Sequence, residues 1–231
     1  MTYFDDRLSG VRVEGGECGG KSATIETSAD GGVSWVASDL GGLVLSDVLS
    51  VTLSGEFQVD IVGKLGSDCS VGMVTSYTGG QFWAVRTDAL SEATYFDADA
   101  NVIHDGGSTV ANPCSSPLVV RSFDSDSTLV CDDGVLAITE ARTIAVVQRP
   151  GVLDGEVVGD QTAVAIDDPS TCDGVLVSVT GNTTSAVLGQ SCLAADATSG
   201  VSIAANGQLV RLWVGSVVYE SEDRGTSWTQ L

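Results

Sequence analysis

The stretch that decides the predicted fold lies near the C-terminal end of the chain and reads Ser221-Glu222-Asp223-Arg224-Gly225-Thr226-Ser227-Trp228. It follows residues 209–219, a run rich in apolar side chains. Ser and Asp side chains accept hydrogen bonds from turn amides, and Gly supplies a positive φ. A Trp ring can then cover the hairpin as a local core. The pattern therefore predicts a strand, a tight turn and a second strand.

The octet recurs along the chain. Residues 28–35 match it at every defined position, and residues 76–83 keep Ser, Gly and Trp with Thr in the Asp position. Residues 122–129 keep Ser, Asp and Thr, whereas residues 178–185 keep only Ser and Thr. Successive copies start 48, 46, 56 and 43 residues apart. These intervals are close to the ~40–50 residues of one blade in propeller repeats.

The octet resembles the Asp-box (BNR) repeat of β-propellers such as sialidases. This resemblance implies blades of four antiparallel strands, with the octet in the turn between the third and fourth strands. We therefore expect an all-β chain in which residues 1–231 form a single β-propeller domain of five four-stranded blades. Six blades would require a hidden repeat in the 56-residue interval. In the five-blade assignment, residues 152–160 are an insertion in the fourth blade.

The octet residues are predicted to be structural. Trp228 and Trp35 should pack under their hairpins, so truncating either ring should destabilise the fold. Leu129 and Ser185 occupy the Trp position in the two weak copies and should tolerate substitution. Composition agrees with an all-β fold, because the chain contains 28 Gly and 4 Pro, and no window of about 10–12 residues keeps a helical period.

Charge limits the classes of partner. The chain has 31 acidic and 10 basic residues and a formal net charge of −21, which argues against binding nucleic acid. No run reaches the ~18 apolar residues of a membrane span, and residues 1–6 lack the features of a secretory signal. A virion component that reaches the exterior by lysis would reconcile the missing signal with six cysteines. A cytoplasmic protein with free thiols is the alternative.

Catalysis of the sialidase type would need an arginine cluster, a Tyr nucleophile paired with Glu, and an acid/base Asp. The chain supplies arginines and tyrosines at Arg12, Arg86, Arg121, Arg142, Arg211, Tyr3, Tyr95 and Tyr219. However, no arginine motif of that family is found near the N-terminus, and we predict no catalytic residues. The lone histidine, His104, precedes Asp105 and could act as a general base. With no nucleophile identified, we expect it to be a surface residue in a turn.

We expect no cofactor. Pairs of acidic residues make a bound calcium ion the one alternative. The pairs are Asp97 with Asp99, Asp124 with Asp126, Asp132 with Asp133, and Asp167 with Asp168. Ca²⁺ prefers several oxygen ligands from a loop, but no pair completes an EF-hand-like loop. No Cys-x-x-Cys motif occurs, and one histidine cannot complete a usual zinc set. We therefore predict no metal site.

Cys172 and Cys192 are predicted to form a disulfide, and the sequence leaves the pairing of the other four cysteines open. When the fourth octet is folded about its centre so that Ser178 faces Ser185, Cys172 and Cys192 lie opposite one another within one residue. Directly opposed residues are close enough for a disulfide after slight adjustment. Cys114 and Cys131 match less closely, and Cys18 and Cys69 would bridge adjacent blades. Six free thiols remain the expectation for a reducing cytoplasm.

Together these features predict a non-catalytic binding or assembly module that presents its loops to a protein or glycan partner. A virion (phage) surface, tail or adhesin component present in many copies fits the high acidity. A sialidase-type glycoside hydrolase is the alternative.

Overall fold

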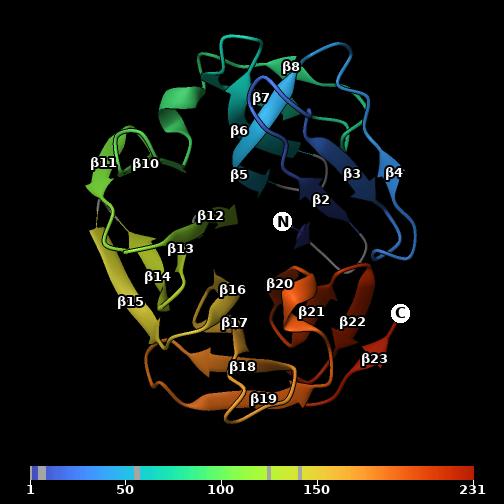
Figure 1. The fold of residues 1–231 in the computed structure, drawn as a ribbon, viewed down its shortest axis with the longest axis vertical. Coiled ribbons are helices and arrows are strands. Elements are labelled where there is room, and N and C mark those ends of the chain that lie inside the picture. The colour runs from blue at the N-terminus through green and yellow to red at the C-terminus, as the bar shows by residue number, and fades with distance from the viewer. Residues whose placement is uncertain (1, 5–8, 55–57, 124–125, 140–141) are drawn as a thin grey trace. The chain divides into compact units, whose positions relative to one another are not determined.

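The structure, a computed structural model, describes residues 2–4, 9–54, 58–123, 126–139 and 142–231. It consists almost entirely of strands, β1–β23, with two short 3₁₀ helices, η1 (Leu90–Glu92) and η2 (Ala197–Ser199). The chain divides into two compact units, made mainly of residues 3–112 with 120–125 and of residues 113–119 with 126–231. Figure 1 shows the strands in chain order from blue to red. The predicted all-β class is confirmed.

The first unit holds three runs of hydrogen-bonded strands. The first run comprises β1 (Thr2–Phe4), β2 (Gly10–Glu14), β3 (Thr24–Ser28) and β4 (Val36–Ala37). The second comprises β5 (Leu45–Ser54), β6 (Gln58–Leu65), β7 (Ser70–Ser76) and β8 (Ala84–Val85). The third comprises β9 (Tyr95–Asp97), β10 (Val102–Asp105) and β11 (Ser108–Ala111). The end of β12 (Pro117–Phe123) pairs in parallel with β5, Val120 opposite Ser50.

The second unit continues in the same manner. After β12 come β13 (Asp126–Cys131), β14 (Gly134–Thr139) and β15 (Arg142–Gln148). A four-stranded sheet follows, with β16 (Val152–Val158), β17 (Gln161–Asp167), β18 (Val175–Gly181) and β19 (Val187–Leu193). The last sheet comprises β20 (Val201–Asn206), β21 (Leu209–Val214), β22 (Val217–Ser221) and β23 (Thr229–Gln230). By hydrogen bonding the described strands form five sheets, one of them of eight strands, and in chain order they fall into six consecutive runs, one more than the number of octets.

The additional run arises in the interval between the third and fourth octets. The insertion predicted over residues 152–160 is in fact strand β16, with Asp154 and Glu156 both 3 % exposed. Acidic residues such as Asp154 and Glu156 are more often found in exposed loops than in buried strands. In the structure, Asp154 accepts a hydrogen bond from the Ile203 amide at 2.9 Å and Glu156 accepts one from the Ala205 amide at 2.6 Å. Both amides belong to β20, which explains how a strand can bury these carboxylates.

The third and fourth octets, the two weak copies, depart from the predicted pattern. Leu129 lies within β13, fully buried and opposite Leu136, so the prediction that it tolerates substitution is wrong. Asp124 and Ser125 of that octet lie outside the described residues. The fourth octet holds the turn between β18 and β19, the third and fourth strands of its sheet, but the Asn182 amide donates to the Asp160 carbonyl instead of to Ser178. Ser178 pairs with Gln190, and Ser185 sits in the turn with φ 51°. Neither copy retains both the Asp and the Gly of the last octet.

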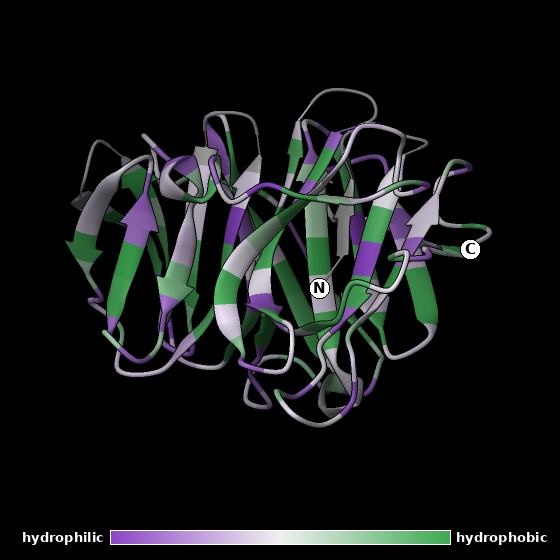
Figure 2. Cartoon of the chain, turned by 90° about the horizontal axis from the view of Figure 1, so that it is seen from above, coloured by the Kyte–Doolittle hydropathy of each residue, from purple (hydrophilic) through white to green (hydrophobic). Residues whose placement is uncertain are grey.

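The hydrophobic cores lie where these strands pack. In the first unit, a cluster of apolar side chains from β2, β3, β5, β6 and β7 includes Val11, Ile25, Val51, Ile61 and Val74. In the second, another cluster draws on β17, β18, β20 and β21. Figure 2 shows apolar and polar segments alternating along several strands. This alternation is expected for strands with one face in a core.

The three strong octets form the same hydrogen-bonded turn. In each, the first Ser hydroxyl accepts the amide of the Gly four residues later, at 2.8 Å from Gly32, 2.9 Å from Gly80 and 2.7 Å from Gly225. These glycines have φ near 81–88°, a region that favours glycine. The third residue then accepts the amide of the seventh. Asp223 does so from Ser227 at 2.8 Å, and Thr78 replaces Asp in the second octet at 3.0 Å.

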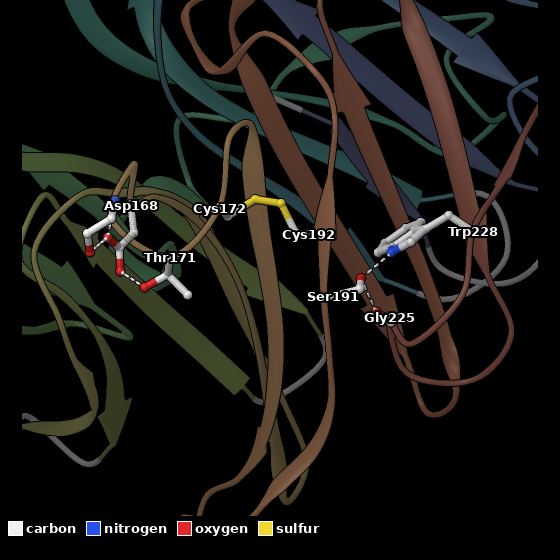
Figure 3. Close-up of a disulfide and its surroundings, with 8 residues drawn as sticks. Asp168, Thr171, Cys172, Ser191, Cys192, Gly225 and Trp228 are labelled. Atoms are coloured by element: carbon white, nitrogen blue, oxygen red, sulfur yellow. Dashed lines mark hydrogen bonds between the residues drawn. A yellow bond between two sulfur atoms is a disulfide. The ribbon is translucent and has the colours of Figure 1, made fainter.

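The Trp of the last octet makes a different contact from its counterparts. The indole nitrogens of Trp35 and Trp83 each donate to the carbonyl of the Gly in their own turn at 3.0 Å. The indole of Trp228 instead donates to the Ser191 hydroxyl on β19 at 2.7 Å, and Ser191 donates to the Gly225 carbonyl at 2.5 Å (Figure 3). Ser191 thus ties the last octet to the neighbouring sheet.

All six cysteines are paired, in the disulfides Cys18–Cys69, Cys114–Cys131 and Cys172–Cys192. The predicted Cys172–Cys192 bond is therefore confirmed (Figure 3). Its predicted geometry is wrong, because Cys192 faces Leu176 across the β18–β19 ladder. Cys172 lies before β18 begins, so the bond fastens the β17–β18 loop to the edge strand β19.

The Ser191 contacts can be tested by a double-mutant cycle. Trp228→Phe removes the indole donor and Ser191→Ala removes the bridge, each with an expected cost of about 0.5–1.5 kcal/mol in the free energy of unfolding. Because both changes break the same bond, the double variant should lose less than the sum, as measured by denaturant unfolding. Trp35→Phe combined with Ser191→Ala is the control and should be additive. Additivity in the Trp228 cycle would contradict the contact.

The disulfide between Cys172 and Cys192 should stabilise the protein measurably. Its partners are 20 residues apart. A cross-link closing a loop of this size contributes about 2–4 kcal/mol, so replacing both cysteines with Ser should lower the free energy of unfolding by that amount. Non-reducing peptide mapping provides the direct check. Alkylation of either cysteine in protein purified under air would show that the bond does not form.

The last octet should also make stability depend on pH. Hydrogen bonds from the Ser227 hydroxyl and amide, and then from Ser221, lower the pKa of Asp223 to about 2. A carboxyl with a depressed pKa stabilises the fold above its unfolded pKa of about 3.9, and this contribution is lost as the pH falls towards about 2. The difference in unfolding free energy between wild type and Asp223→Asn should therefore shrink from pH 6 to pH 2.5. Asp99→Asn, an exposed acid outside the octets, should show no such trend.

Candidate functional site

The arginines proposed for a sialidase-type site are engaged locally. Arg12 on β2 lies directly across from Glu26 on β3, with its Nε 2.5 Å from the carboxylate. Its guanidinium also lies 4.6 Å from the centre of the Trp35 ring, a cation–π arrangement. Arg211 on β21 likewise faces Glu220 on β22, at 2.7 Å. Each guanidinium therefore serves to join adjacent strands of its own sheet.

A third arginine is held at the surface. Arg86 bonds the Asp88 carboxylate and donates to the Tyr77 hydroxyl. Hydrogen bonding to Asp88, together with its charge, raises the pKa of Arg86 further above its usual value. Arg121 is buried within β12, and the side chains of Arg142 and Tyr3 lie outside the described part of the chain.

The histidine and two tyrosines complete the predicted set. His104 lies on strand β10, not in a turn, and its ring stacks on Tyr95 with 4.5 Å between centroids. Its Nε2 is 3.8 Å from Asp97. Burial raises the pKa of Tyr95, which makes it a poorer nucleophile. Tyr219 packs against the apolar cluster of the second unit. These residues contribute to the sheets of the fold. They were considered together as candidate catalytic residues only because of their residue types.

The acid pairs act mainly as caps of turns. Asp97 accepts the amides of Asp99 and Ala100 at 2.9 and 3.0 Å. Asp168 accepts hydrogen bonds from Ser170, Arg149 and Thr171, which hold the pKa of its carboxyl well below the usual range. Within the residues that the structure describes, no three His, Cys, Asp or Glu side chains are grouped so that they could hold a metal ion.

A pocket in the first unit is the strongest candidate for a binding site. It encloses about 260 Å³ and lies between the β2–β3–β4 strands, the β5–β6 pair and the turn of the second octet. Val11, Leu53 and Val59, all less than 7 % exposed, supply its apolar surface. Val36 adds a further apolar side chain, and the remaining lining residues are small or carry hydroxyl or amide groups: Ser9, Gly10, Thr27, Ser28, Ala29, Gln58, Thr78, Gly79 and Gln81.

No charged side chain is among the described residues that line this pocket, although the chain carries a net charge of −21. A small, mostly apolar cavity with a few polar groups at its edge is typical of a ligand site. The pocket cannot be recognised in the sequence, because its walls come from segments far apart in the chain. The fourth octet residue is glycine in both the first octet (Gly31) and the second (Gly79), so it is no signal specific to this pocket.

A second, more open cavity of about 390 Å³ lies beside the Cys172–Cys192 bond in the second unit. Asp167, Asp173 and Asp196 contribute to its wall. Asp196 is already engaged there, because its carboxylate accepts the Thr198 amide and caps η2. This cavity therefore offers a less defined site than the uncharged pocket.

Comparison with known proteins finds similarity only to solved structures, at low sequence identity. No protein-family model and no curated protein matches the sequence. None of the described helices is long and apolar enough to cross a membrane. Among solved structures, YCF48 bound to D1 peptide is 16% identical over 100% of this chain and 79% of that chain, with a TM-score of 0.37. The GH74 xyloglucanase from Xanthomonas campestris is 14% identical, covering 100% and 38%, with a TM-score of 0.36. The RRP9 WD40 repeats are 12% identical, covering 96% and 82%, with a TM-score of 0.41.

Proposed function

We propose that this chain is a non-catalytic binding module that presents the loops of its sheets to a protein or glycan partner. The observation that carries the proposal is the pairing of Arg12 with Glu26 and of Arg211 with Glu220 across adjacent strands. A sialidase-type enzyme needs guanidinium groups that are free to hold a substrate carboxylate. Freeing Arg211, whose side chain is 5% exposed, would leave Glu220 without its partner, which is costly for a buried pair.

We also propose an assignment of the fold. The six strand runs are the blades of an Asp-box β-propeller in which the three strong octets fix the turns between third and fourth strands. Support comes from the recurrence of one hydrogen-bond pattern at Ser28, Ser76 and Ser221. Degenerate octets between them are tolerated because the disulfides and buried side chains hold those sheets.

The proposed setting is an oxidising exterior, such as the surface or tail of a virion or an adhesin, where the chain would occur in many copies. Three disulfides support it, because such bonds persist in oxidising environments. The high negative charge would limit nonspecific association in a crowded assembly. A cytoplasmic location would leave the disulfides without an oxidant.

The proposal predicts binding without turnover. Purified protein incubated with a panel of fluorogenic sialosides and neutral glycosides should release no fluorophore above buffer, while glycan or peptide arrays should show saturable binding. Any turnover would be repeated with Arg12→Ala, a surface-accessible variant that disrupts the Arg12–Glu26 pair, and with Leu118→Arg as a control at an exposed position outside both arginine pairs. Turnover that survives both changes marks a contaminant. Turnover lost in Arg12→Ala alone would establish the hydrolase alternative.

A further inference from the structure

We propose that the uncharged pocket of the first unit receives an apolar side chain of a partner polypeptide, and that Gly79 keeps it open. This inference deepens the proposed function, on which it rests, by naming the kind of partner and its point of attachment. The volume of about 260 Å³ suits one side chain better than an extended ligand. Buried Val11, Leu53 and Val59 would contact that side chain.

The side chains that line the pocket favour a peptide over a charged ligand or a sugar. A charged ligand would find no counter-charge among the described lining residues. A sugar ring usually packs its C–H face on an aromatic ring, and none of those lining residues is aromatic. The side-chain amide of Gln81 lies at the wall and can bond to peptide groups, whereas Gln58 already donates to Asp60 and the Thr78 hydroxyl is engaged in its own turn. An apolar side chain with a peptide backbone meets each of these requirements.

The neighbouring edge strand adds a second reason. Val36, which lines the pocket and is 67% exposed, belongs to β4, the last strand of its sheet. An extended segment lying along a sheet edge can form main-chain hydrogen bonds while pockets select its side chains. Exposed apolar groups beside a pocket are typical of surfaces that bind proteins.

A comparison of two octets explains why the pocket exists. Both turns pack on the preceding sheet. A Cβ added to Gly80 would meet the Thr27 methyl at 2.4 Å, and one added to Gly225 would meet a Val177 methyl at 3.3 Å. The residue before these glycines has φ 63° at Gly79 and 58° at Arg224.

The side chain at this position differs between the two octets. In the last octet, Arg224 reaches across to the preceding sheet, where its Nε donates to the Gln161 side chain at 3.2 Å. In the second octet the equivalent position is Gly79, which has no side chain, and the pocket lies beside it. The same turn therefore fills the junction between sheets in one place and leaves a binding site in the other.

This comparison supplies the test variant. Gly79→Arg should fill the pocket while keeping the turn, because Arg224 already adopts the required φ in an identical setting. Gly79→Asn controls for the loss of glycine, since Asn tolerates the left-handed region and is short. Val33→Arg controls for the added charge, because Val33 is 75% exposed and does not line the pocket.

The experiment is a methyl NMR titration of the full chain with N-acetyl-leucinamide, N-acetyl-glutamate amide and methyl galactoside. Leucinamide should shift the methyl signals of Val11, Leu53 and Val59 saturably, and the other two probes should not. Gly79→Arg should weaken leucinamide binding at least tenfold, with both controls within twofold of wild type. If Gly79→Arg fails to fold, the methyl signals that shift in the wild-type protein test the inference by themselves.

Three results would overturn the inference: leucinamide shifts elsewhere on the chain, shifts from the galactoside at the pocket, or no shifts at all. Each leaves the non-catalytic role intact, because that role fails only through glycoside turnover. Conversely, turnover would remove the proposed function whatever the titration shows. The two failures are therefore distinguishable.

Discussion

The hydrogen bond from a glycine amide to the first serine of each strong octet is the contact on which the surrounding architecture depends. It closes the turn, holds Gly32, Gly80 or Gly225 at positive φ, and so directs the following Trp onto the hairpin. A Cβ at Gly80 would collide with the preceding sheet, so the same residue type also permits close packing between sheets. One local bond thereby determines both a hairpin and the way it meets its neighbour.

Where that bond is present, the sequence predicts the strands closely. The last octet was predicted to be a turn between two strands, and it lies between β22 and β23. Where the octet is degenerate, prediction fails, and β16 shows why. Its Asp154 and Glu156 are polar in the sequence but bond to amides 49 residues away. No local pattern can reveal a partner at that separation, so the segment was interpreted as an insertion.

The disulfide and the pocket likewise show that local sequence features could be predicted, whereas features that depend on distant contacts could not. Cys172 and Cys192 were paired correctly from their spacing, yet Cys172 lies before β18 begins and Cys192 faces Leu176 instead. Spacing predicts which cysteines are near one another, but it does not determine the register in which the residues of the two strands pair. The pocket was missed altogether, although the difference between Gly79 and Arg224 is visible in the sequence. Its meaning depends on two octets packing alike against a preceding sheet, which only the structure reveals.

The carboxylates of β16 have a consequence for how this chain behaves among its own copies. Strand β20 ends its sheet, and an unpaired strand edge is a template on which another chain can add and initiate aggregation. The amides of Ile203 and Ala205 at that edge are occupied by Asp154 and Glu156. An incoming strand would have to displace two anionic acceptors and place its carbonyl groups beside them. Ser202, Ile203 and Ala204 are buried at this edge, so the side chains of β16 cover it against an incoming strand.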